Sequence, residues 1–599
     1  MTERIINKII KIISIVFFIL LSYALYVIYR SPAEGNELSI YTPYINVWII
    51  LLSGMVFSLF SLEYIVSIKK NTPNRYIVSL LLLLIIWIIL IMPQLRGYAL
   101  YGRDDSNTHL GIVIDIIKYG HLGEEVYPII HLIIVTITYF TDIEAQTIIQ
   151  YMGPLFSMFS LLFIYALSYY IFKDAGKSIF IVAISVFPIA NIESTPNRLA
   201  ELTIPIVLLL YIKYKYEPRV SISALLIIFT ILYPLYHPIS SLLLILSFLG
   251  SDIINFVLKQ SKLNFNSSNC CKWSILPLIS LVIIFLWFWN HYSFWDYNIG
   301  NVIRWFGGEI INSGSRTKEV LTLFDKYHIN FFELLIKVWS HQIVYISISA
   351  LAIFMMFERI IRPNKNRKFD ITVIEKLVLS SSWIIIPMIL AVGLMFVPST
   401  ASPDRMLRYV GILSTIFVGW FFFDIRKKPV RMLLLMFIVV LMVNSALVIH
   451  PSPYIHVPNS QVTKMEFDGM AWFFEHRNQG IEIKNIFERY FRFADAMLGI
   501  KATSSSNLIG NYYDQQILDH FGYDNYTKIG DSNHNTFYLL LGKFDESVHL
   551  HMFNAVNAFN SGDFDKIYNY DSSANKIYSN NEFTVFLINQ QKVAKSTLT

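Results

Sequence analysis

The stretch IIKIISIVFFILLSYALYVIY, residues 9–29, is long and apolar enough to cross a lipid bilayer. A helix of about 20 apolar residues spans the roughly 30 Å hydrocarbon core. Because no small-residue cleavage site follows this run, we interpret it as a membrane span rather than a cleaved signal. Similar runs recur along the 599 residues, of which 55% are hydrophobic and only 15% charged. The composition predicts an all-α polytopic membrane protein.

The apolar runs predict about 13 transmembrane helices. We place them at residues 9–29, 46–67, 76–95, 146–172, 178–190, 199–213, 220–234, 239–258, 273–290, 341–358, 373–397, 404–423 and 431–450. Lys and Arg are concentrated in alternate loops, and basic loops normally face the cytoplasm. This pattern predicts a cytoplasmic N-terminus and an extracytoplasmic C-terminal segment in a multi-pass protein of the cell membrane.

The chain divides into four predicted parts. They are N-terminal membrane helices (1–95), a first large external loop with an acidic motif and surface helices (96–145), a transmembrane core (146–450) and an extracytoplasmic α/β domain (451–599). The last part contains 12 Lys and Arg but 16 Asp and Glu, whereas the rest contains 36 and 26. The apolar segment 127–140 is too short for an ordinary span. We interpret it as a surface or re-entrant helix, which a membrane tolerates where it packs on protein.

A charged cluster interrupts the apolar pattern at YGRDDSNTHLG, residues 101–111. It brings together Arg103, Asp104, Asp105 and His109. The segment that follows reads as a short amphipathic helix ending at Gly120, and Asp105 and His109 would share one of its faces because they are four residues apart. One acid here is explained equally well as the N-cap of that helix. Capping does not explain why two acids, an arginine and a histidine occur together.

Two more polar groups lie in predicted external segments. In NIESTPNRLAE, residues 191–201, Arg198 and Glu201 can form a local ion pair, but Glu193 has no such local explanation. In YPLYHPISS, residues 233–241, His237 stands at a turn between two prolines. His131, in YPIIH, is more simply explained as a hydrogen-bonded histidine at a helix interface.

Two arginines enter the predicted span at 404–423. Arg405 and Arg408 are three residues apart and face one way, and arginine binds phosphate oxygens in a bidentate manner. Charged residues in spans are costly and tend to be functional, although snorkelling to the interface is the alternative. Acids, histidines and arginines on one membrane face suit a lipid-linked phosphate substrate. A carboxylate would act as base, and the cations would hold the leaving group.

The stretch DDSNTHLGIVIDIIKYG followed by YPIIHLI resembles the first external loop of class-C (GT-C) membrane glycosyltransferases. STPNRLAEL and YHPISSL resemble segments of archaeal members of this group, so an archaeal or bacterial source is expected. The convincing match covers residues 96–260. Two departures are that the acidic loop follows the third span rather than the first, and that the tail lacks a Trp-Trp-Asp-type acceptor motif.

The resemblance implies an inverting glycosyltransferase that moves a sugar from a polyprenyl-phosphate or polyprenyl-diphosphate donor to a glycan or protein acceptor outside the cytoplasm. It maps the family's acid onto Asp105 or Asp104, and the spacing to His109 favours Asp105. Arg103, His109, His237, Arg405, Arg408, Glu193 and Arg198 would bind the substrate or its phosphate. Diphosphate users in the family bind a divalent cation, here Mg²⁺ or Mn²⁺, for which Asp104, Asp105 and Glu193 are the candidate ligands.

Two other classes of function stay open. A transporter or lipid flippase would place polar residues near the middle of the membrane and show an internal repeat, and neither is clear here. A non-catalytic envelope assembly protein would use residues 451–599 to bind a partner. A nucleic-acid partner is not expected.

Overall fold

The structure is a computed structural model that describes most of the chain. The described residues are 2–41, 44–68, 73–103, 105–123, 125–260, 275–291, 296, 300, 303, 329–362, 371–394, 403–487, 489–505, 517–531, 535–552 and 559–590.

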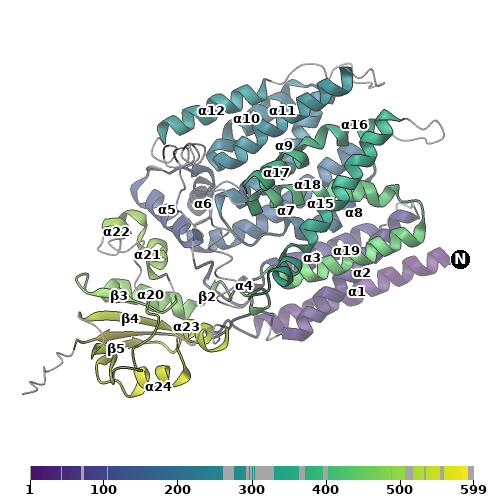
Figure 1. Ribbon diagram of the computed structural model, residues 1–599. Coiled ribbons are helices and arrows are strands. Elements are labelled where there is room, and N and C mark those ends of the chain that lie inside the picture. Colours follow the sequence, from purple (N-terminus) through teal and green to yellow (C-terminus); the bar gives the residue numbers. More distant parts are fainter. Residues whose placement is uncertain are drawn as a thin grey trace, which may run out of the picture.

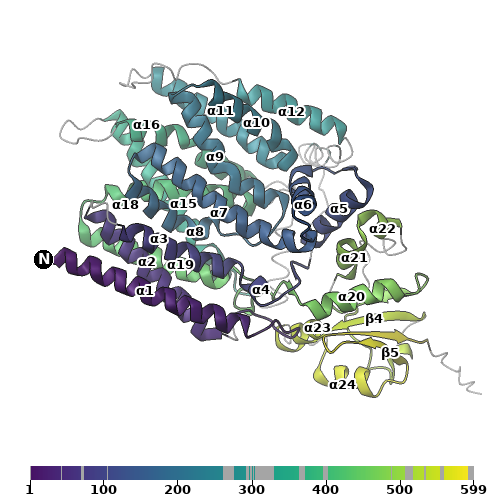
Figure 2. The same cartoon turned by 180° about the vertical axis from the view of Figure 1, so that it is seen from behind.

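A bundle of long helices makes up most of the molecule, as Figures 1 and 2 show from opposite directions. Its helices are α1 (Thr2–Tyr29), α2 (Ile45–Ser67), α3 (Asn74–Leu90), α4 (Met92–Leu95), α7 (Ala145–Phe172), α8 (Ala175–Ile189), α9 (Pro196–Tyr216), α10 (Val220–Tyr236), α11 (Pro238–Gln260), α12 (Leu276–Asn290), α15 (Phe331–Ile361), α16 (Ile371–Ser380), α17 (Ser382–Leu394), α18 (Pro403–Asp424) and α19 (Lys428–Val448). Within the described ranges, eight helices are long and apolar enough to cross a membrane, and shorter apolar helices accompany them.

The described part of every run predicted as a span lies on one or two of these helices, and residues 273–274 and 395–397 lie outside the described residues. The run at 76–95 is divided between α3 and α4. The run at 373–397 is divided between α16 and α17, and α17 ends at Leu394. Their outward surfaces carry large apolar side chains, such as Ile19, Leu162 and Leu433, each about 60% exposed or slightly more. Such a surface is stable only against lipid. The all-α polytopic membrane fold is therefore confirmed.

The short apolar segment after the charged loop forms α6 (Pro128–Thr141). Its 14 residues extend about 21 Å, which is less than the thickness of the hydrocarbon core. One face is buried, including Ile130 and Ile134, whereas Tyr139 and Phe140 at its far end are exposed. The length fits a helix that enters the membrane without crossing it.

Residues after α19 form a small α/β domain, which was also predicted. Its helices are α20 (Lys464–His476), α21 (Tyr490–Leu498), α22 (Ile500–Ser505), α23 (Lys543–Ser547) and α24 (Ser561–Asn569), and its sheet contains β3 (Glu482–Lys484), β4 (Phe537–Gly542), β5 (Ala574–Ser579) and β6 (Phe583–Ile588). The strand order is β3-β4-β6-β5, with β3 parallel to β4 and the other pairs antiparallel. Every residue of β4 is buried, so this strand lies at the centre of the domain.

The C-terminal domain lies at one end of the bundle, and the start of α1 lies at the other end (Figures 1 and 2). The loop between α1 and α2 contacts the domain, because the Asn459 N–H donates to the Leu38 carbonyl and the Gly35 N–H to Glu582. The N-terminus and the domain are thus on opposite sides of the bundle. Which side faces the cytoplasm stays a prediction.

Candidate functional site

The loop after α4 is held on the C-terminal domain. Its two-residue strand β1 (Leu100–Tyr101) pairs antiparallel with β2 (Gln461–Val462). Arg103 then donates two hydrogen bonds to Glu466, at 2.6 and 2.8 Å, and one to the Gln461 carbonyl at 2.8 Å. Its guanidinium also lies 3.8 Å from the centre of the Phe544 ring. Arg103 therefore ties the loop to the domain.

The charged cluster continues into helix α5 (Asp105–Tyr119). The helix ends as predicted at Gly120, whose φ of +74° is the left-handed conformation that glycine adopts easily at a C-terminus. Asp105 is in the first turn, and its side chain is 69% exposed. Its Oδ1 lies 3.0 Å from Nη2 of Arg492 in α21. Asp104 lies outside the described residues.

Helices α5 and α21 are in close contact beyond this ion pair. Thr108 donates to Asp495 at 2.9 Å and accepts a hydrogen bond from Arg492. A Cβ added to Gly111 would lie only 2.4 Å from the Asp495 carbonyl oxygen, so this crossing requires a glycine. Burial raises the pKa of Asp495, and its contacts with Thr108 and Arg492 oppose that change. The C-terminal domain thus carries a polar helix directly onto the acidic loop.

His109, one turn after Asp105, contacts His131 of α6. Nδ1 of His109 lies 3.0 Å from Nε2 of His131, so one ring donates a proton that the other accepts. Burial lowers the pKa of His109 to about 4; Asp105 opposes this effect and Arg492 adds to it. His109 is therefore neutral at neutral pH. Nδ1 of His131 lies 3.8 Å from Glu125, whose pKa burial raises.

His237, between α10 and α11, stacks on Tyr127, with ring centres 5.1 Å apart and planes at 15°. Burial lowers the pKa of His237 to about 3, and the charges of Arg405 and His109 act in the same direction. Burial raises the pKa of Tyr127, and Arg405 opposes that change. Arg405, in the first turn of α18, is thus within electrostatic range of both rings. No residue that the structure describes forms a hydrogen bond or ion pair with Arg405.

The neighbouring arginines are compensated by acids. Arg198, at the start of α9, lies 3.2 Å from Glu193 and 3.4 Å from Glu201. Arg408 lies 3.1 Å from Glu201 and also pairs with Asp404. The Glu201 side chain is only 2% exposed. Glu201 therefore joins α9 to α18 one turn beyond Arg405. Glu193, whose role the local sequence did not explain, is the ion-pair partner of Arg198.

The structure brings the predicted site residues that it describes to one end of the bundle, the end that carries the C-terminal domain. Asp105, His109, His237 and Arg405 form one group, and Glu193, Arg198 and Arg408 form a second group linked by Glu201. Arg408 is within electrostatic range of Glu193. Arg103 belongs to neither group, because it faces Glu466.

The described residues do not fit a divalent cation. Asp105 is paired with Arg492 and Glu193 with Arg198, so each carboxylate already has a positive partner. Among the same residues, no three His, Cys, Asp or Glu side chains are arranged to hold a metal. We therefore derive no step through a metal ion.

Sequence reasoning missed Tyr127 as a site residue, and it missed Glu466, Arg492 and Asp495 of the C-terminal domain. Tyr127 begins the YPIIH motif, so its position in the sequence could have indicated a site residue. The sequence around the three domain residues could not, because they meet the loop only through tertiary contacts.

Fold and site together define a multi-pass helical membrane protein with a cluster of charged and histidine side chains under a small α/β domain. No protein-family model matches the sequence, and no curated protein sequence matches it either.

Solved structures of similar fold exist. Archaeal oligosaccharyltransferase AglB from Archaeoglobus fulgidus, in complex with an inhibitory peptide and a dolichol-phosphate, is 12% identical at a TM-score of 0.44, over 86% of this chain and 74% of that one. The Archaeoglobus fulgidus oligosaccharyltransferase in complex with Zn and sulfate is 12% identical at a TM-score of 0.41, over 85% of this chain and 73% of that one. ArnT from Cupriavidus metallidurans bound to undecaprenyl phosphate is 10% identical at a TM-score of 0.45, over 86% of this chain and 98% of that one. These are likenesses of overall shape, and the function proposed below rests on the residues of this chain.

Proposed function

We propose that this protein is a membrane glycosyltransferase that moves a sugar from a polyprenyl-phosphate or polyprenyl-diphosphate donor to an acceptor on the membrane side where the C-terminal domain lies. That side is extracytoplasmic in the predicted topology. The observation that carries the proposal is the guanidinium of Arg405, which no described residue pairs and which lies within electrostatic range of the half-buried Tyr127 and the buried His237.

Arg405 is suited to bind the phosphate of the donor. A guanidinium presents several N–H donors in a fork that matches phosphate oxygens. Glu201 and Asp404 neutralise Arg408 nearby, but no described carboxylate neutralises Arg405. An anion beside Arg405 would therefore gain a charge-assisted contact without displacing an existing pair, and the leaving phosphate carries more charge than the intact donor.

Asp105 is suited to accept the proton of the acceptor. It is exposed, its ion pair with Arg492 uses Oδ1, and Oδ2 can receive a proton from a hydroxyl or similar nucleophile. In the step, the acceptor atom forms a bond to the anomeric carbon as the carbon–oxygen bond to phosphate breaks. The proton goes to Asp105, and the bonding electrons leave with the phosphate, which Arg405 stabilises.

The other predicted residues act as supports in this proposal. Neutral His109 fixes the first turn of α5 through its hydrogen bond with His131. Arg198, Glu193 and Arg408 hold the starts of α9 and α18 together through Glu201. Arg103 holds the loop on the C-terminal domain. Asp104 stays a candidate second acid.

The test is a transfer assay with membranes that contain the protein and a radiolabelled polyprenyl-phosphate sugar. Asp105→Asn is expected to lower the rate by a factor of about 10²–10⁴, which is the usual contribution of a general base. Asp468→Asn is the matched control, because Asp468 is an exposed acid on α20 that forms no ion pair with a described residue. Equal transfer by wild type, Asp105→Asn and Asp104→Asn would remove the catalytic assignment, and accumulation of substrate without a covalent product would favour a transporter.

A further inference from the structure

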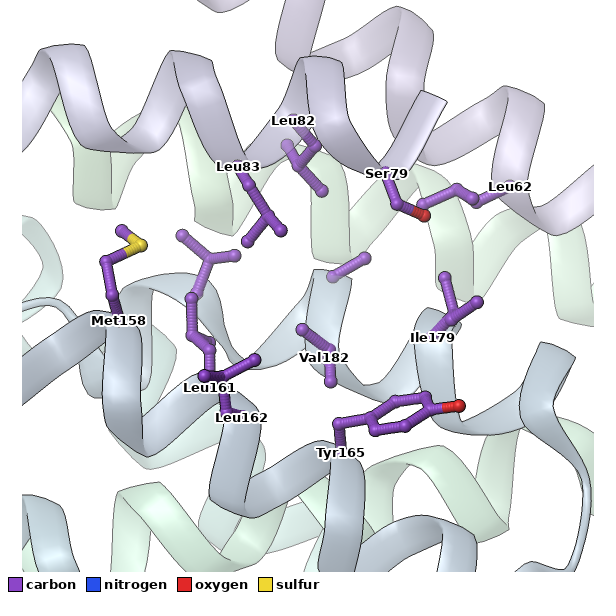
Figure 3. Close-up of a pocket in the computed structure, with 12 residues that line it drawn as sticks. Leu62, Ser79, Leu82, Leu83, Met158, Leu161, Leu162, Tyr165, Ile179 and Val182 are labelled. Atoms are coloured by element: carbon purple, nitrogen blue, oxygen red, sulfur yellow. The ribbon is translucent and has the colours of Figure 1, made fainter. Parts of the chain in front are cut away.

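An apolar pocket of about 270 Å³ lies between α2, α3, α7 and α8. Figure 3 shows its lining side chains, which are almost all apolar; Ser79 and Tyr165 carry hydroxyl groups. Leu162, one of the lining residues, is 59% exposed on the outer surface of the bundle. The pocket is therefore a groove that opens toward lipid, and an apolar groove in a bilayer is a place for hydrocarbon.

The groove runs along the helices and begins near the end of the bundle opposite the C-terminal domain. Leu62 precedes the end of α2 by five residues, and Ile179 follows the start of α8 by four. The groove continues to Met158 of α7, seven residues from Tyr165, or about 10 Å at 1.5 Å per residue. In Figure 3 the hydroxyls of Ser79 and Tyr165 lie at one end of the groove and Met158 at the other. Its polar end thus faces the membrane surface.

One turn beyond that polar end lies a buried arginine with an unused donor. Arg75 is 9% exposed and lies four residues before Ser79, on the same face of α3. Its Nη2 donates to the Tyr76 hydroxyl at 2.5 Å, but its Nε is buried without a hydrogen-bond partner. In the described part of the chain no carboxylate pairs with Arg75. Its guanidinium also lies 4.6 Å from the centre of the Tyr76 ring. A buried guanidinium that has these neutral contacts but no carboxylate partner is stabilised by an accompanying anion.

The surrounding charges at this end are also positive. Lys173 and Lys177 flank the start of α8, which packs against α2, so that a Cβ added to Gly176 would lie 3.4 Å from the Val66 side chain. Of the nearby acids, Glu63 is paired with Arg431 at 2.9 Å, and Asp174 caps the helix by accepting from Gly176 and Lys177. Neither lysine forms an ion pair with a described residue, so the start of α8, with one acid and two lysines, has a net positive charge that favours an anion.

We propose that this groove binds one acyl chain of an anionic phospholipid, with the phosphate of the lipid paired to Arg75. Basic sites between membrane helices bind anionic lipid headgroups in this way. The lipid comes from the leaflet opposite the C-terminal domain, which is cytoplasmic in the predicted topology. The site is separate from the cluster around Asp105 and Arg405, and it does not depend on the proposed transferase function.

The test uses the full-length protein in detergent, incubated with equal amounts of phosphatidylglycerol and phosphatidylcholine of the same acyl chains. Native mass spectrometry then measures which lipid is retained. The wild type is expected to retain phosphatidylglycerol about fivefold over phosphatidylcholine, the preference typical of one basic contact. Arg75→Gln is expected to bring this ratio close to one. Arg219→Gln is the matched control, because Arg219 is an exposed arginine at the same end and should keep the wild-type ratio.

A second variant tests the groove without changing charge. Val182→Trp fills the apolar lining and is expected to reduce retention of both lipids, so it decides the outcome if Arg75→Gln fails to fold. The proposal is overturned if the wild type shows no preference, or if folded variants at Arg75 and Val182 both retain lipid as the wild type does. If equimolar undecaprenyl phosphate displaces phosphatidylglycerol, the proposal that the groove binds a phospholipid is overturned.

Discussion

Arg492 of the C-terminal domain forms an ion pair with Asp105 of the first loop, at 3.0 Å, although the two residues are far apart in the sequence. The same arginine donates to Thr108, one turn along α5. The C-terminal domain therefore contributes directly to the candidate site and fixes the direction of its acid.

Arg492→Gln is expected to lower sugar transfer at least tenfold and to lower the free energy of unfolding by about 1–3 kcal/mol. The ion pair contributes little of this loss, because Asp105 is mostly exposed to solvent, which screens the pair. Most of the loss comes from the hydrogen bond to Thr108, which Arg492 donates from a side chain that is only 14% exposed. Activity depends on the direction of the carboxylate, which the arginine sets. Thermal unfolding and the transfer assay measure the two effects. Arg489→Gln is the control at an exposed arginine next to α21. A variant at Arg492 with wild-type transfer would show that Asp105 needs no partner.

Arg103→Met is expected to destabilise the protein by about 3–5 kcal/mol, which is the usual cost of leaving a buried charge without its partner. The Glu466 side chain is only 2% exposed and would lose both hydrogen bonds. The double variant Arg103→Met/Glu466→Leu should recover most of the loss, because it removes both charges. Chemical denaturation measures each variant. If the single variant is as stable as the wild type, the loop is not held by this pair.

The sequence was sufficient to predict the helices of the membrane bundle and the course of α5, because both depend on local patterns. Runs of about 20 apolar residues define a span, and Gly120 ends α5 through its left-handed conformation. The spacing of Asp105 and His109 likewise predicted a shared helix face. These features are properties of a few neighbouring residues.

The partners of the site residues were not predictable in the same way. Arg103 has the residue type expected of a phosphate ligand, but only the fold shows that Glu466 occupies it. Arg405 and Arg408 look equivalent in the sequence, and the buried Glu201, which comes from another helix, distinguishes them. Tertiary contacts between distant segments leave no local signal in a single sequence.

His109 is expected to make the protein less stable in acid. Its pKa is about 6.5 in the unfolded chain and about 4 in the folded protein, so between these values the unfolded state binds more protons. The free energy of unfolding therefore falls as the pH falls from about 6.5 to 4, on the order of 3 kcal/mol in total. His109→Gln should flatten this part of the profile of melting temperature against pH. The exposed His476, changed to Gln, is the control, and an unchanged slope in His109→Gln would contradict the assignment.

Gly111→Ala is expected to separate α5 from α21. The added Cβ would lie 2.4 Å from the backbone oxygen of Asp495, which cannot move without shifting its helix. Overpacking of this kind costs about 1–3 kcal/mol, and the displacement would also move Arg492 away from Asp105. Gly393→Ala in α17 is the control, because no atom lies within 4 Å of its added Cβ. Thermal unfolding and transfer should both fall in the first variant and neither in the second.

Arg405 and Arg408 are expected to respond oppositely to the same substitution. Arg405→Gln removes a cation that no described acid compensates, so the free energy of unfolding should change little. The transfer rate should fall by a factor of about 10² or more, because this is the usual effect of losing one group that stabilises developing charge. Arg408→Gln instead leaves the buried Glu201 with Arg198 alone at 3.4 Å, so loss of stability should dominate. Arg405→Lys keeps the charge but loses the bidentate fork, and should recover part of the activity. Donor titration of the transfer rate, measured beside thermal unfolding, separates the two roles. If Arg405→Gln transfers sugar at the wild-type rate while Asp105→Asn is inactive, the phosphate is held elsewhere, and Arg405 serves only to keep His237 neutral.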